Sequence, residues 1–138
     1  MKRLEVVSPN HIYHVWDKVK DYLENGLKLS GGEYGVEHLK LYLTSGQQTL
    51  LVIIDEEHNI HGAFTVEITN FPNERIAFTT SVGGKGITEQ GLWNQYEQWL
   101  KDNGVTMIRG AAHETVARLW RRKFGVQSRY IIVEKKLK

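Results

Sequence analysis

A glycine-rich turn contains the residues with the clearest chemical use. The stretch reads Ser81-Val82-Gly83-Gly84-Lys85-Gly86-Ile87-Thr88 and lies between a predicted strand and a predicted helix. Its three glycines let the backbone approach a ligand closely and leave amide N–H groups exposed. The start of the following helix adds partial positive charge, and Lys85 adds a full charge. The pattern predicts a phosphate or pyrophosphate site over residues 81–88, although glycine clusters also form plain strand-to-helix turns.

Two pairs of histidines could bind a metal ion. His11 and His14 are three residues apart on a predicted helix, and His58 and His61 are three apart across a predicted turn. A metal site needs further ligands, and the spacing marks no third one. We therefore expect exposed histidines and no metal site.

A basic patch lies in the last predicted helix and consists of Arg118, Arg121, Arg122 and Lys123. It could contact the phosphates of a nucleotide or of a nucleic acid. Cations near a helix C-terminus are also favourable for the helix dipole alone, and this explanation ranks first.

The spacing of apolar and chain-breaking residues predicts ten elements that position these groups. Helices are expected from Ser8-Pro9 to Gly26 and over residues 36–44, 88–102 and 114–124. Strands are expected over residues 3–7, 49–55, 60–71, 75–82, 105–110 and 128–134. The central hairpins need antiparallel pairing, whereas the strand–helix–strand unit over 75–110 needs a parallel crossover. The expected fold class is α+β (α/β/α), with a mixed, mostly antiparallel central sheet and helices on both faces.

Length and composition fit one globular domain over residues 1–138. The chain has no cysteine, which excludes disulfides, iron–sulfur clusters and thiol nucleophiles. A net charge of +2 is too small to favour nucleic acid or an anionic membrane as the main partner. The longest uninterrupted apolar run, Leu50 to Ile54, is far too short to span a membrane. The expected location is the cytoplasm.

The order of elements resembles the GNAT N-acetyltransferase superfamily, and the segment from about Leu50 to Val133 carries the likeness. In that family a strand ends in Q/R-x-x-G-x-G/A, whose amides hold the pyrophosphate of acetyl-coenzyme A. Residues 81–86 match both glycines but begin with serine. A later family helix reads A-x-x-L-Y-x-x-x-G-F, and residues 117–126 match its alanine, its glycine and its apolar spacing. The glycine turn and residues 130–135 look most like the short GNAT-like proteins of bacteriophages and prophages, which would place the chain in a host cytoplasm or a virion.

The resemblance implies binding of acetyl-CoA at residues 81–88 and transfer of its acetyl group to a primary amine. In the family, a backbone N–H just before the glycine turn, here about Val82, donates to the thioester oxygen. Two catalytic features of the family have no counterpart here. Its general-acid tyrosine falls on Arg121, which cannot release a proton near neutral pH. Its strand carboxylate, often the general base, is missing from residues 76–81.

Other residues are candidates for the missing catalytic groups. Glu67, His113 or Glu33 could act as the base, and Tyr130 could replace the acid. Each also has an ordinary structural role open to it, because strand and loop residues of these types are commonly solvent-facing or packed. We select Glu67 and Tyr130 as the catalytic pair.

The leading hypothesis is an acyl-CoA-dependent N-acetyltransferase with an unidentified small-molecule or protein acceptor. The rival hypothesis is a catalytically degenerate GNAT-like module that serves as a phage virion or host-interaction protein. A small nucleic-acid binder that uses residues 118–123 is a third alternative. The last predicted strand could also pair between two subunits and form a homodimer.

Overall fold

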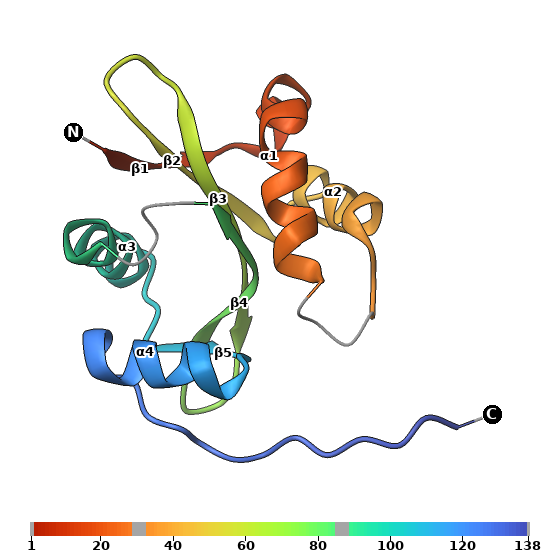
Figure 1. Ribbon diagram of the computed structural model, residues 1–138, viewed down its shortest axis with the longest axis vertical. Coiled ribbons are helices and arrows are strands. Elements are labelled where there is room, and N and C mark those ends of the chain that lie inside the picture. Colours follow the sequence, from red (N-terminus) through yellow and green to blue (C-terminus); the bar gives the residue numbers. More distant parts are fainter. Residues whose placement is uncertain (1, 29–32, 85–88, 138) are drawn as a thin grey trace.

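The computed structural model describes residues 2–28, 33–84 and 89–137 of the chain. Its centre is a five-stranded sheet in the order β1-β2-β3-β4-β5 (Figure 1). The pairs β1–β2, β2–β3 and β3–β4 are antiparallel, and the pair β4–β5 is parallel. The strands span Arg3–Val7, Thr49–Ile54, Ile60–Asn70, Arg75–Gly84 and Met107–Gly110. The predicted mixed, mostly antiparallel sheet is confirmed.

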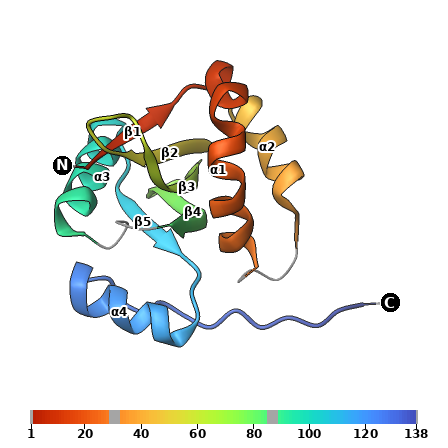
Figure 2. The same ribbon diagram turned by 45° about the horizontal axis from the view of Figure 1, so that its top comes forward.

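Helices cover both faces of this sheet, as predicted (Figures 1 and 2). Helices α1 and α2 lie on one face and α3 lies on the other, while α4 follows β5 beside the sheet. Their bounds are Ile12–Leu27, Val36–Thr44, Gln90–Asp102 and Glu114–Phe124. None of the described helices is both long enough and apolar enough to cross a membrane.

Strand β2 supplies apolar side chains to both layers of the core. Leu50 and Val52 pack with α1 and α2, whereas Leu51 packs with Phe64 and the α3 residues on the opposite face. Successive strand residues point to opposite faces, so a continuous apolar run is buried on both sides. All residues from Leu50 to Ile54 are buried, so this strand is covered on both faces.

Helix α1 begins as predicted and ends later than predicted. The Ser8 hydroxyl accepts a hydrogen bond from the Asn10 amide at 3.2 Å, and Pro9 opens a short 3₁₀ turn before the helix. The helix continues through Gly26 to Leu27. A Cβ on Gly26 would lie 2.3 Å from Ser81 Oγ on β4. Gly26 therefore allows close packing of α1 on β4, and its interpretation as a helix stop was wrong.

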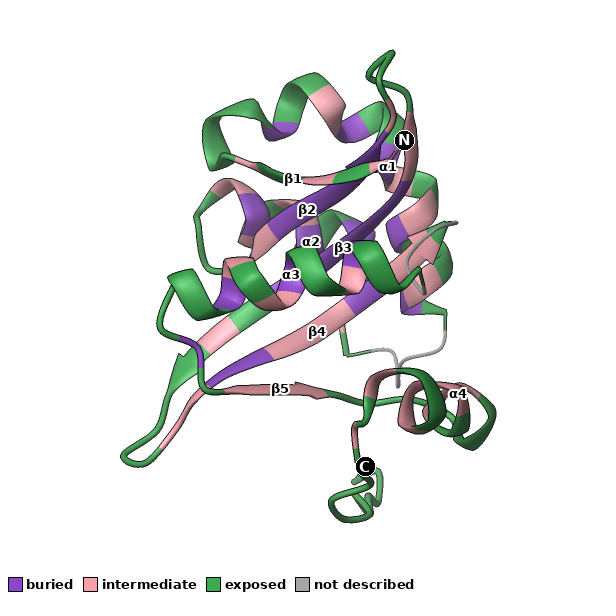
Figure 3. Cartoon of the chain, turned by 90° about the vertical axis from the view of Figure 1, so that its left-hand side faces the viewer, coloured by how far each residue is buried: buried purple, intermediate pink, exposed green. Residues whose placement is uncertain are grey.

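The C-terminal part of the chain differs most from the prediction. Helix α4 has the predicted bounds and ends at Gly125 in the left-handed conformation, but none of its residues is buried (Figure 3). The strand predicted over 128–134 does not form, and this segment is extended chain without strand pairing. Ile131 and Val133 are 87% and 85% exposed. A strand needs a neighbour for its hydrogen bonds, and this segment has none within the described chain.

Candidate functional site

Strands β4 and β5 separate part of the way along the sheet. Their parallel pairing runs from Ile76–Met107 to Thr79–Gly110 and ends there. Strand β4 continues to Gly84, and over this last part it pairs only with β3. The central sheet is therefore open on the β5 side of residues 80–84, among the residues that the structure describes.

A β-bulge lies at the point of separation. Ser81 is opposite Thr65, and Thr79 is opposite Val66, so Thr80 is an extra residue on β4. A bulge bends its strand and increases the local twist. The bend turns β4 away from β5 directly after their last paired residues.

A chain of buried polar groups holds the bulge. The Thr80 hydroxyl donates to Gln48 Oε1 at 2.6 Å. It lies 2.6 Å from the Thr65 hydroxyl, and because Thr80 has a single proton, Thr65 is the donor of that bond. Gln48 is 4% exposed and Thr65 is fully buried. Buried polar groups keep such bonds because their loss is costly, so this chain fixes the place where the strands diverge.

A small apolar cavity lies at the separation, on the α3 face of the sheet. Its volume is about 50 Å³, which is room for a few water molecules. The lining includes Thr79 and Val82 of β4, Trp93 and Tyr96 of α3, and Trp120 and Phe124 of α4. The rings of Trp93 and Phe124 stack at 4.1 Å and join the two helices. Trp120 also packs over Gly110, where a Cβ would lie 3.5 Å from its ring.

Tyr96 of α3 is a buried titratable residue that lines this cavity. Its side chain is 4% exposed, and no group among the described residues meets hydrogen-bond geometry with its hydroxyl. Burial raises the pKa of Tyr96 to about 12, and the nearby Thr79 hydroxyl opposes this shift. The phenol is therefore a neutral hydrogen-bond donor at physiological pH.

The residues predicted to bind the cofactor are described only in part, because Lys85, Gly86, Ile87 and Thr88 lie outside the described residues. Ser81 is 4% exposed, and its hydroxyl donates to the Leu23 carbonyl oxygen of α1 at 2.8 Å. Its side chain thus fastens α1 to β4. Val82 lines the cavity described above.

Two of the predicted glycines have a packing reason. A Cβ on Gly83 would lie 2.0 Å from the Tyr22 carbonyl oxygen, and one on Gly84 would lie 2.5 Å from the Gly62 Cα atom. Gly84 also has a φ of +93°, which favours glycine. The backbone of β4 is thus held close to α1 and β3. Close approach of a ligand is not needed to explain either of these glycines.

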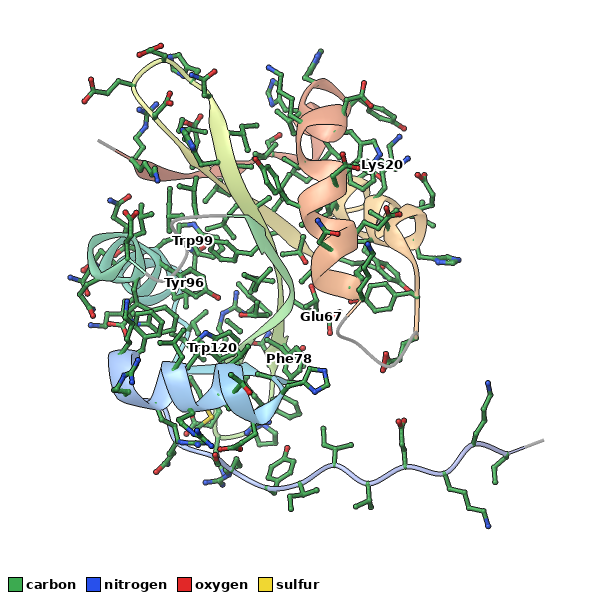
Figure 4. All side chains as sticks on the ribbon, viewed as in Figure 1. Lys20, Glu67, Phe78, Tyr96, Trp99 and Trp120 are labelled. Carbon is green, nitrogen blue, oxygen red and sulfur yellow. The ribbon has the colours of Figure 1, made fainter. Side chains whose placement is uncertain are left out.

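The two predicted catalytic residues lie on the opposite face of the sheet from Tyr96. Glu67, Phe78 and Arg109 are register partners across β3, β4 and β5, and thus share a face. This row is next to the Thr79–Gly110 pair. Figure 4 shows Glu67 and Tyr96 on opposite sides of β4. Tyr130 joins the far end of the row, with its ring 5.9 Å from the Arg109 guanidinium carbon.

Both predicted catalytic side chains are exposed: Glu67 is solvent-facing, and Tyr130 is 64% exposed on the extended C-terminal segment. Glu33 and His113, the other candidates for the base, are exposed as well. His113 precedes α4 and makes no side-chain capping hydrogen bond there. Among these candidates, Glu67 lies in the row beside the strand separation.

Arg121 stands where the resemblance puts a general-acid tyrosine. Its guanidinium forms an ion pair with Glu114 and donates to Ser128 Oγ at 2.6 Å. The hydrogen bond to Arg121 lowers the pKa of Glu114. Arg121 thus joins the first turn of α4 to the chain that follows the helix. Its side chain has a structural role.

The histidines form no metal site within the described residues, as no cluster of three ligating side chains occurs there. His11, His14 and His58 are exposed, as expected. His61 is half-buried, and its Nε2 lies 2.8 Å from Asp55 Oδ2. This contact, with amide hydrogen bonds from the β2–β3 turn, holds the pKa of Asp55 well below its usual value.

Solved acetyltransferase structures resemble the whole chain. One is an aminoglycoside acetyltransferase from an uncultured soil metagenomic sample, in complex with sisomicin: TM-score 0.71, 15% identity, covering 99% of this chain and 97% of that one. Another is an aminoglycoside antibiotic 6'-N-acetyltransferase from Acinetobacter baumannii, with a TM-score of 0.62 and 14% identity over 100% of both chains. A third is a predicted acetyltransferase from Clostridium acetobutylicum with acetyl-CoA. Its TM-score is 0.63 at 12% identity, and the match covers 99% of this chain and 96% of that one. No protein-family model and no curated protein matches the sequence. The chain has the GNAT-like fold of these acetyltransferases.

Proposed function

We propose that the protein is an acyl-CoA-dependent N-acetyltransferase that moves an acetyl group from acetyl-CoA to a primary amine. The observation that carries this proposal is the separation of β4 from β5 at a fixed bulge. Within the described part of the chain, it leaves one side of β4 over residues 80–84 without a strand partner, so its backbone groups can pair with an extended ligand. The likeness to acetyltransferase structures, one of them with acetyl-CoA, supports this choice of ligand.

Residues 82–88 would hold acetyl-CoA, with its pyrophosphate at the predicted glycine turn and its pantetheine arm along β4. The cavity of about 50 Å³ is too small for that arm. The wall formed by Trp120 and Phe124 must therefore move when coenzyme A binds. Helix α4 has no fully buried residue, so the movement would break surface contacts, chiefly the stack of Phe124 on Trp93.

Acetyl-CoA supplies an activated acetyl thioester, and the protein has to position an amine beside it. The amine nitrogen forms a bond to the carbonyl carbon, the carbon–sulfur bond breaks, and the nitrogen loses a proton. Positioning alone supplies much of the acceleration. Glu67, in the row beside the separation, would accept the amine proton, directly or through water. Tyr130 would protonate the leaving thiolate only if the C-terminal segment folded back toward the strand separation.

The alternative, a degenerate module that binds without transferring, is favoured by one specific observation. Arg121 replaces the family's tyrosine and is used in contacts with Glu114 and Ser128. An assay of acetyl transfer to a panel of amines, together with a measurement of acetyl-CoA binding, separates the two functions. Transfer to any member of the panel supports the enzyme. Binding of acetyl-CoA without transfer supports the module.

Isothermal titration with acetyl-CoA, on the wild type and on Lys85→Ala, tests the binding site. A charge-assisted contact to phosphate is worth about 1.5 kcal/mol or more, so we expect at least a tenfold weaker Kd for the variant. Lys101→Ala, an exposed lysine at the other end of α3, is the matched control and should bind as the wild type does. Gly84→Asp is unsuitable, because Gly84 is required by its backbone conformation. Absence of binding by the wild type refutes the proposal.

A further inference from the structure

We propose that Tyr96 donates a hydrogen bond to the acyl thioester where β4 and β5 diverge. This inference rests on the proposed function and deepens it, because it assigns to Tyr96 a contact with the reacting group. The buried Tyr96 hydroxyl lies near the Thr79 hydroxyl but makes no hydrogen bond of good geometry with any described residue. Tyr96 and Thr79 both line the cavity at the strand separation.

A buried hydroxyl without a partner is costly, and phenols inside proteins usually find an acceptor. The ring of Tyr96 is held in place by its neighbours: Phe64 packs against it edge-on at 5.0 Å, and Trp93 and Trp99 lie at 5.8 and 6.3 Å. The hydroxyl therefore has a defined direction, toward Thr79 at the end of the β4–β5 pairing. A group held in this way meets the requirement for a preorganised donor.

The position fits a thioester better than it fits a phosphate or an amine. The cavity walls near Tyr96 are apolar, and a phosphate or an ammonium ion would be strongly desolvated there. A thioester is neutral, and it needs one donor only as its oxygen or sulfur gains negative charge during transfer. Glu67 lies on the opposite face of the sheet, so an amine and its base would approach from the side away from Tyr96.

Tyr96→Phe tests the assignment by a combination of effects. Because the hydroxyl makes no hydrogen bond with any residue that the structure describes, its removal should leave Tm no lower than that of the wild type. The variant should bind free CoA as the wild type does and acetyl-CoA less tightly, and its kcat should fall by about 10²-fold. Tyr13→Phe, a change in a tyrosine that is 72% exposed on α1, is the control and should alter none of these values.

The outcomes separate this inference from the proposed function. If the wild type binds no acetyl-CoA, the proposed function fails. If the wild type binds and transfers, and Tyr96→Phe keeps both its kcat and its affinity for acetyl-CoA, the role of Tyr96 is refuted. A fall in Tm together with equal losses for CoA and acetyl-CoA would show a packing role, and would also refute it.

A second inference comes from the C-terminal segment, residues 126–137. We propose that its apolar run, Ile131 to Val133, pairs with β5 of a second copy of this chain. Ile131, Ile132 and Val133 are 87%, 73% and 85% exposed. A continuous apolar run of this kind is typical of a strand covered on both faces. The segment leaves the body below α4 and extends away from the sheet (Figures 1 and 3).

The chain also contains the complement of this segment. Strand β5 is at the edge of the sheet and pairs only with β4 among the described residues. An open edge and an unpaired strand on one molecule can satisfy each other by reciprocal exchange between two copies, which closes under two-fold symmetry. Contacts of Ser128 with Arg121 and of Tyr130 with Arg109 fix the start of the segment, so only the residues after it need to reach the partner.

Light scattering after size exclusion tests this interface. We expect the wild type to be a dimer and the double variant Ile131→Asp/Val133→Asp to be a folded monomer with an unchanged far-ultraviolet spectrum. Leu41→Asp, a change at an exposed apolar residue of α2, is the control and should remain a dimer. A monomeric wild type, or a dimer that survives the double substitution, overturns the proposal.

Discussion

Thr80→Val should destabilise the protein because it removes the central hydroxyl of the chain that holds the bulge. The substitution conserves shape, but it leaves the Gln48 amide oxygen and the Thr65 hydroxyl without the partners seen at 2.6 Å. Both of these side chains are buried. Each buried polar group without a partner costs about 1–3 kcal/mol. Because Thr80 itself is only half-buried, we expect the loss in the free energy of unfolding to lie in the lower part of the range for two such groups, at about 2–4 kcal/mol. Tm should fall by roughly 6–16 °C for a domain of this size.

Urea unfolding followed by circular dichroism measures this loss. The midpoint should fall while the m-value stays constant, since the surface exposed on unfolding is the same. Thr69→Val, at an exposed threonine of the neighbouring strand, is the matched control and should change stability by less than about 0.5 kcal/mol. If Thr80→Val behaves like this control, the hydroxyl chain does not hold the bulge. Our account of the strand separation would then be wrong.

Other residues give further tests. Gly83→Ala should cost about 2 kcal/mol or more, because its Cβ would lie 2.0 Å from the Tyr22 carbonyl oxygen. By contrast, Gly91→Ala on α3 should stabilise by about 0.5 kcal/mol in the same unfolding assay, because the added Cβ would meet no other described residue within 4 Å outside the helix's own backbone. The pKa of Asp55 is lowered mainly by its bond to His61, so its contribution is present above the ordinary value of 3.8 and is lost as pH falls through the lower, folded-state pKa. In thermal melts over a pH series, Asp55→Asn should be less stable than the wild type at pH 7 and should lose less stability below pH 3.8. Equal falls in Tm of the variant and the wild type below pH 3.8 would contradict this prediction.

The fold could be predicted from the sequence wherever local signals agree with the tertiary structure. The Ser8-Pro9 start, the α2 bounds and the α4 bounds all follow from caps and apolar spacing, and the structure confirms them. The end of the first helix was wrongly predicted at Gly26 because a glycine near the end of a helix usually marks its C-terminus. Here it serves a contact with β4, made by residues 55 positions away in the sequence, and no local pattern reports such a contact.

The candidate site could be predicted only in part. The glycine turn and Glu67 were found because they stand out by residue type or strand position. The bulge at Thr80 was missed, since an extra strand residue is visible only once the register with β3 is known. Tyr96 was missed for a related reason: helical spacing marks it as an inward-facing aromatic. Only the packed structure reveals that its hydroxyl has no hydrogen-bond partner in the described part of the chain. The segment 128–134 was predicted to be a strand because its composition is typical of one. Composition does not report whether a neighbouring strand is available to pair with it.

The glycines of the turn and the strand separation carry different weight as evidence for an acyl-carrier site. Gly83 and Gly84 are explained by contacts with α1 and β3, so their presence alone would be expected in a protein that binds nothing. Early divergence of β4 from β5 has no such packing explanation, because continued pairing would satisfy more backbone groups. On one face of the sheet, hydrogen bonds among Thr80, Gln48 and Thr65 hold the bend in β4. On the other face, the buried Tyr96 hydroxyl has no hydrogen-bond partner among the described residues. A buried hydroxyl without a partner costs stability unless a ligand in the opening accepts its hydrogen bond, and this cost is the physical reason to expect a ligand there.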